Sequence, residues 1–234
     1  MCAQVFAEHG VELLLVARSR SALEGVAGCL PEPTKHSIYV GDLTRHDDVL
    51  GLTEAARKFG DIDVILHTMG GGLGMRDRLL SWEQLDTLFK TNVAAAAEIN
   101  RLIIPDMIGR GTGNVVHVGS IAGVEAVGSV GYNSVKAALA AYTRSLGREL
   151  AGTGVIVTGI LPGGFWAPDN SFVRLHEKNP ENLDKVIADR QPRGRLGDAR
   201  TEIVPLLLYL SSRQATMMTG CCVPIDGGEG LTYV

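Results

Sequence analysis

Residues 115–120 read VVHVGS and residues 132–136 read YNSVK, and these two stretches decide the fold of the chain. The apolar run before Gly119 predicts a strand that is buried on both faces, as in a parallel sheet covered by helices. Tyr132 and Lys136 are four positions apart, so they share one face of the helix predicted over residues 131–150. Ser120 comes just after the strand. The strand end and the helix face can therefore place the three side chains around one small volume.

Apolar runs alternate with helical periods on both sides of this unit. Strands are predicted at residues 11–17, 37–40, 63–67, 115–118, 155–161 and 221–225. Helices are predicted at residues 20–29, 47–59, 81–108, 131–150 and 199–211, the third of them bent near Pro105. This alternation predicts an α/β fold with a doubly wound, Rossmann-like parallel sheet. No repeat or linker interrupts residues 1–234, so a single domain is expected.

The composition fits a globular chain and excludes several function classes. Hydrophobic residues make up 45 % of the 234 residues, and the net charge is −4. The sequence has no basic block, no bilayer-length apolar run and no basic amino-terminal region, so we expect no nucleic-acid binding, membrane span or secretory signal. Cys2, Cys29, Cys221 and Cys222 lack the spacing of a metal site or a disulfide framework. Reduced thiols in the cytoplasm and no bound metal are therefore expected.

Residues 163–198 are the least regular segment of the sequence. Three aromatic side chains in it are predicted to be exposed: Phe165, Trp166 and Phe172. Loops of this length in compact domains are usually functional, which predicts a lid over a substrate pocket. The aromatic rings suggest an apolar part of that pocket, and Arg174 or His176 could meet an anionic group. A variable surface excursion is the alternative.

Ser120, Tyr132 and Lys136 suit hydride chemistry at a carbonyl group. Ser120 would donate a hydrogen bond to the carbonyl oxygen, and Tyr132 would give or take the proton. The charge of Lys136 is expected to lower the pKa of the phenol from about 10 toward neutrality. The alternative is a surface helix with an ordinary tyrosine and lysine, because Tyr-x-x-x-Lys alone is common.

Several further motifs follow in a fixed order along the chain. They are Asp42-Leu43-Thr44, Asn92 within Lys-Thr-Asn-Val, Ser120, Tyr132 with Lys136, Pro162-Gly163, the RGRLG stretch at 193–197, Thr219-Gly220 and Asp226-Gly227-Gly228. Their order and spacing resemble the short-chain dehydrogenase/reductase family over about residues 1–228. Within this family, the chain resembles the 3-oxoacyl-carrier-protein reductase-like members.

The resemblance implies positions for cofactor-binding residues. Asp42 and Leu43 would lie at the adenine ring, and Gly70 would let the backbone pass close to the cofactor. Pro162 and Gly163 would lie beside the nicotinamide. In the same family pattern, the catalytic tyrosine and lysine also contact the cofactor.

Three positions depart from the family pattern. The family's Thr-Gly-x-x-x-Gly-x-Gly loop and the strand before it have no counterpart, because residues 3–10 align with the helix that follows that loop. His67 replaces a sheet-stabilising Asn and is expected to be a hydrogen-bonded structural group rather than a catalyst. Ala167 replaces a Thr that bonds the nicotinamide amide, so that anchor is not expected.

The absent strand would lie between the strands predicted at 11–17 and 63–67. Without it, two buried strand edges would keep unpaired N–H and C=O groups. We therefore expect the sequence to be a fragment of a longer chain. The alternative is a product that has repacked and lost normal cofactor binding.

The end of the second family strand, here residues 11–17, bears on the choice between NADP and NAD. A carboxylate there would accept hydrogen bonds from the ribose hydroxyls and repel a 2′-phosphate. This chain carries Arg18 and Arg20 instead, and either guanidinium could pair with a 2′-phosphate. NADP is therefore expected in preference to NAD. Two solvated arginines at a helix start are the alternative.

Together these features predict an NADP(H)-dependent oxidoreductase that interconverts a small-molecule carbonyl and alcohol. Tyr132 would be the general acid/base and Ser120 would polarise the oxygen. By the resemblance, Lys136 would hold the nicotinamide ribose and Asn92 would anchor a water in the proton relay.

The resemblance also implies a homodimer or homotetramer, formed by the helices at 81–108 and 131–150 and by the last strand. A monomer whose helices only cover the sheet is the alternative. A non-catalytic truncated relative, acting as a structural or binding protein, is the second hypothesis for function. A sugar-nucleotide epimerase is disfavoured because the chain has no room for a larger C-terminal substrate domain.

Overall fold

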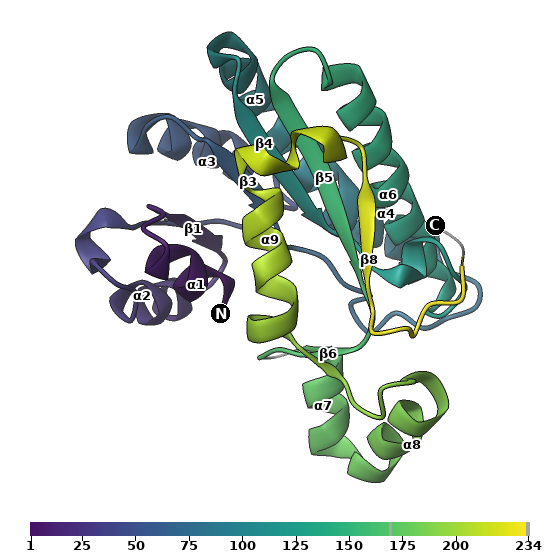
Figure 1. Cartoon of the computed structure of the whole chain (residues 1–234). Helices are drawn as coiled ribbons and strands as arrows, with labels where there is room; N and C mark the ends of the chain where they lie inside the picture. The colour runs from purple at the N-terminus through teal and green to yellow at the C-terminus, as the bar shows by residue number, and fades with distance from the viewer. Residues whose placement is uncertain (169, 233–234) are drawn as a thin grey trace.

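Four parallel strands form the central sheet in the computed structural model, which describes residues 1–168 and 170–232. β4 (Gly113–Val118) pairs with β3 (Val64–His67) on one side and with β5 (Val155–Pro162) on the other. β8 (Cys222–Ile225) pairs with the far edge of β5. The register sets His67 beside His117 and Val118 beside Ile160. The predicted parallel α/β sheet is confirmed (Figure 1).

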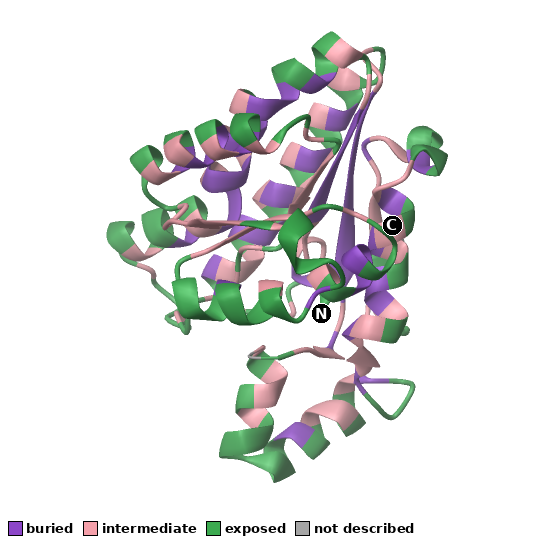
Figure 2. Ribbon diagram, turned by 90° about the vertical axis from the view of Figure 1, so that its left-hand side faces the viewer, coloured by how far each residue is buried: buried purple, intermediate pink, exposed green. Residues whose placement is uncertain are grey.

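Helices cover both faces of this sheet, which is why β4 and β5 read as continuous apolar runs. On one face, α3 (His46–Phe59), α5 (Ala95–Arg110) and α6 (Val130–Leu150) pack in a cluster that includes Val115. On the other face, α1 (Cys2–Glu8) and α9 (Val204–Leu210) pack in a cluster that includes Val116. Both valines are fully buried, and Figure 2 shows the central strands as the most buried part of the molecule.

The helix predicted at 81–108 is divided into three parts. α4 (Trp82–Phe89) begins at Ser81 with a capping box and leads into the π-helical turn η2 (Lys90–Ala94) and then into α5. α5 continues through Pro105, where a bend is expected, and the helix changes its pitch earlier, at η2. Single π-helical turns of this kind are frequent at functional sites.

β1 (Leu14–Ala17) and β2 (Ser37–Val40) form a separate parallel pair. α2 (Arg20–Gly28) packs on this pair, and Figure 1 shows the pair lying apart from the central strands. In the described part of the chain, no strand pairing joins β1 to β3. The two unpaired strand edges expected from the sequence are therefore present.

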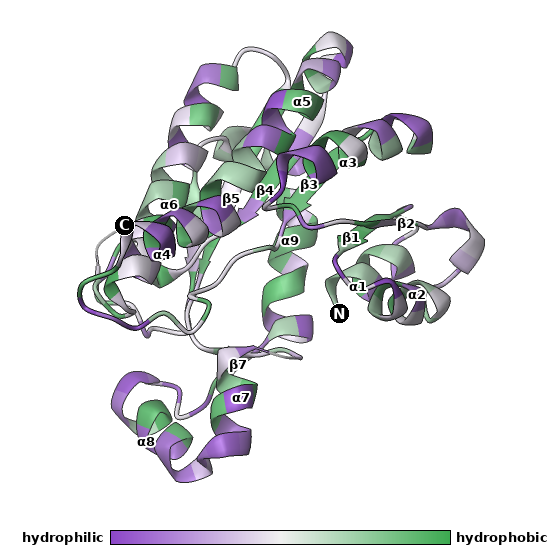
Figure 3. Cartoon of the chain, turned by 180° about the vertical axis from the view of Figure 1, so that it is seen from behind, coloured by the Kyte–Doolittle hydropathy of each residue, from purple (hydrophilic) through white to green (hydrophobic). Residues whose placement is uncertain are grey.

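Residues 163–198 are more regular than expected. β6 (Phe165–Trp166) pairs with β7 (Gly197–Asp198), and between them lie α7 (Ser171–Lys178) and α8 (Pro180–Arg190). Asn170 caps α7 by accepting from two backbone N–H groups, and Pro180 occupies the first turn of α8. Proline favours that position, so Pro180 begins a helix where the sequence predicts irregular structure. In Figure 3 many residues of α8 are coloured as hydrophilic, whereas α9 is mostly hydrophobic.

The remaining elements are short. They are η1 (Pro33–Lys35), η3 (Ile121–Gly123), the π-helical turn η4 (Ala199–Ile203) and η5 (Arg213–Met218). None of the helices in the described residues has both the length and the apolar character needed to cross a bilayer.

Candidate active site

The structure brings Ser120, Tyr132 and Lys136 together. Ser120 follows β4 and its Oγ accepts from the backbone N–H of Ala122 at 3.1 Å, which fixes the start of η3. Tyr132 and Lys136 come from the first two turns of α6, which packs against η3 and β5. The Ser120 hydroxyl hydrogen-bonds the Tyr132 phenol, and Lys136 Nζ lies 5.8 Å from the centre of the Tyr132 ring. The side chains predicted from two separate stretches thus meet in one site.

Lys136 is a buried cation at the end of β4. Its side chain is only 3 % exposed, and its Nζ donates to the Val118 carbonyl oxygen at 3.0 Å. Burial disfavours the charged form and lowers the pKa of Lys136 to about 8. The ammonium can therefore exchange a proton close to neutral pH.

The expected lowering of the Tyr132 pKa is wrong. Burial of the phenol raises its pKa above the usual value, and the hydrogen bond with Ser120 offsets this only in part. An apolar environment penalises the phenolate more than the neutral phenol. Lys136 directs its Nζ to the Val118 carbonyl oxygen. The phenol of Tyr132 consequently stays protonated at neutral pH.

Asn92 and Gly70 form the side of the site next to Lys136. Asn92 lies in η2, where its Oδ1 accepts from Gly71 N at 2.9 Å and its Nδ2 donates to Gly71 O at 3.0 Å and to Leu88 O at 2.9 Å. Gly70 has φ of +153°, and a Cβ there would lie 2.7 Å from Asn92 Oδ1 and 3.1 Å from Lys136 Nζ. Only glycine fits this gap, so Asn92 holds a glycine turn against the buried ammonium.

His67 belongs to a buried polar network under this turn. Its ring stacks on His117 with centroids 5.0 Å apart, and its Nε2 donates to Asn100 Oδ1 at 2.8 Å. The Asn100 amide in turn donates to His117 Nε2 and to the Tyr142 hydroxyl, both at 3.2 Å. Burial lowers the pKa of His67 to about 4. The predicted structural role of His67 is supported. Asn100 and Tyr142 belong to no sequence motif, so the sequence analysis did not identify them.

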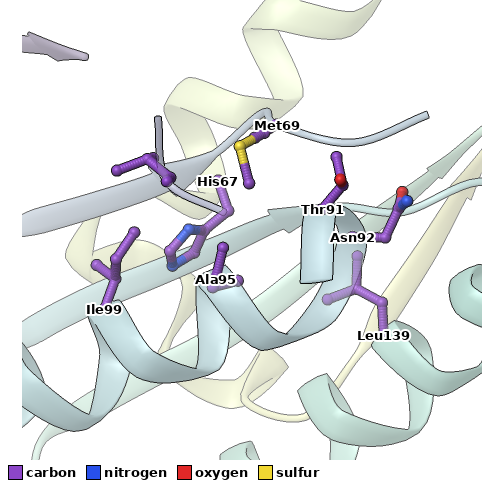
Figure 4. A pocket seen from close by; sticks show the side chains of 9 residues that line it. His67, Met69, Thr91, Asn92, Ala95, Ile99 and Leu139 are labelled. Carbon is purple, nitrogen blue, oxygen red and sulfur yellow. The ribbon is translucent and has the colours of Figure 1, made fainter. Parts of the chain in front are cut away.

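A small hollow lies beside the glycine turn at the ends of the central strands (Figure 4). Its lining consists of Leu43, His67, Met69, Thr91, Asn92, Ala95, Ala96, Ile99 and Leu139. Its volume is about 20 Å³, which suits one water molecule rather than a dinucleotide. The predicted contacts Leu43 and Asn92 thus line the same hollow.

Arg18 and Asp42 lie near each other at the ends of β1 and β2. Asp42 Oδ1 accepts from Thr44 N at 3.0 Å and from Thr44 Oγ1 at 2.7 Å. These two hydrogen bonds lower the pKa of Asp42, and the charge of Arg18 adds to the effect. Arg18 itself is exposed, so its guanidinium is accessible from solvent.

Pro162 and Gly163 end β5 in a tight turn. A Cβ on Gly163 would lie 2.6 Å from Glu229 Oε2 and 2.8 Å from Asp226 Cβ. The Glu229 side chain is 4 % exposed and accepts at 2.6 Å from Gly164 N, from the Gln191 amide and from the Arg190 guanidinium. Glu229 thus ties the turn after β5 to the end of α8. Sequence reasoning missed it because a single Glu after a glycine pair carries no motif.

The predicted contacts for a nicotinamide dinucleotide fall into separate groups in the structure. Gly70 lies against Asn92 and the Lys136 ammonium, and Gly163 lies against Glu229 and Asp226. Arg18 and Asp42 lie near each other at the ends of β1 and β2. Within the described residues, no glycine-rich loop lies ahead of α1 to hold a pyrophosphate, and no group of three His, Cys, Asp or Glu side chains could hold a metal ion.

The fold and the Ser120–Tyr132–Lys136 site define a short-chain dehydrogenase/reductase. The family model described as enoyl-(acyl carrier protein) reductase matches residues 1–229, and the chain belongs to this family.

Two curated relatives span nearly the whole chain. The 3-oxoacyl-[acyl-carrier-protein] reductase FabG of Thermotoga maritima is 29 % identical over 230 residues, which are 96 % of this chain and 89 % of that protein. The gluconate 5-dehydrogenase of Gluconobacter oxydans is 28 % identical over 229 residues, which are 97 % of this chain and 88 % of that protein.

Solved structures agree with this assignment. The L-sorbose reductase of Gluconobacter frateurii, in complex with NADPH and L-sorbose, superimposes with a TM-score of 0.90 at 26 % identity, covering 99 % of this chain and 92 % of that one. An actinorhodin polyketide ketoreductase with NADPH gives a TM-score of 0.89 at 25 % identity with the same coverage. The chain is thus an oxidoreductase by family and by fold.

Proposed function

We propose that the chain interconverts a carbonyl and an alcohol by NADP(H)-dependent hydride transfer, with Tyr132 as general acid/base. The observation that carries this proposal is the convergence of Ser120 from the end of β4 with Tyr132 and Lys136 from α6. Relatives named as reductases and dehydrogenases, and neighbours solved with NADPH, support the reaction class.

In the reductive direction, bound NADPH would supply a hydride to the carbonyl carbon. Ser120 donates a hydrogen bond to the carbonyl oxygen and polarises it. Tyr132 then gives its phenolic proton to that oxygen, which becomes the alcohol. Because the pKa of Tyr132 is raised, the phenol keeps its proton at neutral pH and can donate it as negative charge develops on the carbonyl oxygen. General acid catalysis of this kind is worth about 10²–10⁴-fold.

Lys136 and Asn92 would restore the proton. Lys136, with a pKa of about 8, can pass a proton toward the phenolate that forms on Tyr132. Asn92 lies across Gly70 from the ammonium and would anchor a water that leads to solvent. Lys136 would also hold the nicotinamide ribose.

NADP is the proposed cofactor. Arg18 is exposed at the end of β1 and would pair with a 2′-phosphate. Asp42 and Leu43 would contact the adenine. At the other end, Gly70, Pro162 and Gly163 would border the nicotinamide, and the two glycines carry no side chain that could block it.

The segment 163–198 would act as a lid over the substrate. Glu229 couples its α8 end to the Gly163 turn, so movement of α7 and α8 would be transmitted to the site. Trp166 meets the ring of His176 edge-on at 5.7 Å and would form part of an apolar wall.

A homodimer or homotetramer in the cytoplasm is the proposed state of the protein. Trp82, Leu85 and Phe89 lie on one face of α4 and are exposed, Trp82 to 83 %, and Val130 at the start of α6 is 55 % exposed. A second copy would cover this apolar surface. The cysteines of the described chain are free thiols, which is the state that a reducing cytoplasm would maintain.

The test is turnover of a panel of carbonyl compounds with NADPH. Tyr132→Phe is expected to lower kcat by at least about 10²-fold, because the proton donor is lost. Tyr209→Phe removes the same hydroxyl from an exposed tyrosine of α9, outside the site, and is expected to keep most of the activity. Turnover by Tyr132→Phe at the wild-type rate would refute the assignment.

A second candidate is a non-catalytic structural or binding protein. The two unpaired strand edges and the small hollow favour it. Titration of the chain with NADPH, followed by cofactor fluorescence, separates the two candidates. Saturable binding supports the enzyme, and no binding supports the second candidate.

A further inference from the structure

The carboxy-terminal tail, which we define as residues 226–232, continues from the end of β8 (Figure 1). Its first turn is fixed by Asp226, whose carboxylate oxygens accept from Gly228 N at 2.9 Å and from Gly230 N at 3.0 Å. Gly227 and Gly228 have φ of +66° and +89°, values that favour glycine. The backbone of the tail therefore follows a defined path after β8.

Glu229 holds the tail to the lid segment. Its Oε2 accepts from the Gln191 amide and from Gly164 N, and its Oε1 pairs with the Arg190 guanidinium, each at 2.6 Å. Arg190 and Gln191 lie at the end of α8, whereas Gly164 follows β5. The side chain of Glu229 is 4 % exposed and Gln191 is 5 % exposed, so water competes little for these bonds. One buried carboxylate thus joins the tail, the lid helices and the turn after β5.

Glu125 holds the other end of the tail. Its Oε1 accepts from Leu231 N at 2.6 Å, from Thr232 N at 3.0 Å and from Thr232 Oγ1 at 3.1 Å. Glu125 N in turn donates to Ile121 O at 2.9 Å, which ties this residue to η3, the turn that begins at Ser120. The tail is thus anchored both to the lid and beside the proposed catalytic serine.

The two anchoring carboxylates lie near one shared cation. Burial alone would raise the pKa of Glu125, but the hydrogen bonds from the tail and the charge of Arg190 lower it. The same Arg190 pairs directly with Glu229. Gly230 permits the close path between the two anchors, because a Cβ there would lie 2.9 Å from Glu125 Oε1. The lid end, the tail and the loop after Ser120 therefore form one connected unit.

We propose that the tail is a clamp that fixes the lid relative to Ser120, and that Glu229 is the positioning residue of this clamp. The inference rests on the proposed function, in which the lid covers the carbonyl substrate. Glu229 bonds the lid and the turn after β5 rather than the side chains that move the proton. Loss of the clamp therefore weakens substrate binding and leaves the chemical step intact, which raises KM without lowering kcat.

Hydrogen exchange of the 234-residue chain, without substrate or cofactor, tests the clamp itself. In Glu229→Gln one carboxylate oxygen becomes an NH₂ group, which cannot accept, so part of the contact with the lid is lost. Exchange in residues 171–190 is expected to become at least about tenfold faster than in the wild type. Glu181→Gln removes the same charge at the exposed start of α8 and is expected to change this exchange less than about twofold.

Steady-state kinetics with NADPH and the best substrate of the carbonyl panel test the consequence for binding. Glu229→Gln should raise KM at least about tenfold while kcat changes less than about threefold, because a charge-assisted hydrogen bond to the lid is lost. Glu125→Ala releases the other end of the tail and should raise KM by a similar factor. Since both variants open the same clamp, the double variant should raise KM no further than the larger single effect.

A second variant pair covers the case in which Glu229→Gln does not fold. Arg190→Met keeps the carboxylate and removes only its charged partner on the lid, whereas Lys185→Met removes an exposed cation from the same helix. Arg190→Met should speed exchange in residues 171–190 and raise KM, and Lys185→Met should do neither.

Four results would overturn the proposal. Unchanged exchange of the lid in Glu229→Gln, or an equal effect in Glu181→Gln, would mean that Glu229 does not hold the lid. A fall in kcat at constant KM would place Glu229 in the chemical step. Multiplicative effects of Glu229→Gln and Glu125→Ala on KM would mean that the two anchors act separately. If the wild type turns over no carbonyl compound, the proposed function fails, and the exchange comparison still decides whether Glu229 holds the lid.

Discussion

Replacement of Lys136 by methionine should stabilise the protein at neutral pH. The folded chain holds this lysine at a pKa of about 8, compared with 10.5 for the free side chain. At about 1.4 kcal/mol per pH unit, the folded state disfavours the charge by about 3 kcal/mol below pH 8. Loss of the hydrogen bond to the Val118 carbonyl offsets about 1 kcal/mol of this. Lys136→Met is therefore expected to unfold with a free energy about 2 kcal/mol higher at pH 7.

The pH dependence identifies the cause of this effect. Between pH 8 and 10.5 the unfolded wild type still holds a proton that the folded chain has lost, so wild-type stability rises with pH in this window. Lys136→Met lacks this contribution, and its advantage should fall and then change sign by about pH 10.5. Urea unfolding at pH 7, 8, 9 and 10 measures the difference, with Lys185→Met on exposed α8 as the control for a lysine that is not buried. A difference for Lys136→Met that is constant across this range would refute the reasoning.

Three further substitutions test other parts of the structure. Gly70→Ala should lower the free energy of unfolding by about 1–3 kcal/mol, measured in urea, because its φ of +153° strains alanine and its Cβ would meet Asn92; an unchanged midpoint would exclude the close approach. Asn114→Leu should cost about 1–3 kcal/mol in thermal unfolding, because its amide donates at 2.9 Å and 3.1 Å to two carbonyls at the end of α9. Arg18→Glu should weaken NADPH binding about tenfold or more while NADH binding changes little, as measured by fluorescence titration. Equal losses for both cofactors would argue against a 2′-phosphate contact.

Features of the fold that depend on residues close together in the sequence were predictable. The alternation of apolar runs and helical periods located the strands, and residues 37–40 were predicted with the bounds that β2 has. The four-residue spacing of Tyr132 and Lys136 placed them on one face of α6, and Ser120 followed from the end of β4. Each of these inferences depends on a period or a spacing of a few residues, which local geometry determines.

Features that depend on contacts distant in sequence were not predictable. The π-helical turn η2 accompanies the reach of Asn92 to Gly71, 21 residues away. Glu229 holds Gly164 across 65 residues without any motif. The direction of the Tyr132 pKa shift depends on how deeply the phenol is buried. The sequence predicts a lowered pKa from the charge of Lys136, whereas burial raises it.

The transfer of deuterium from labelled NADPH to a carbonyl substrate tests the proposed chemistry most directly. Incubation of the 234-residue chain with the labelled cofactor and the best substrate of the carbonyl panel should yield an alcohol that carries the label on its former carbonyl carbon. The Tyr132→Phe variant should yield almost none under the same conditions. Unlabelled alcohol from the wild type, or equal labelling by the two proteins, would be incompatible with hydride transfer assisted by Tyr132.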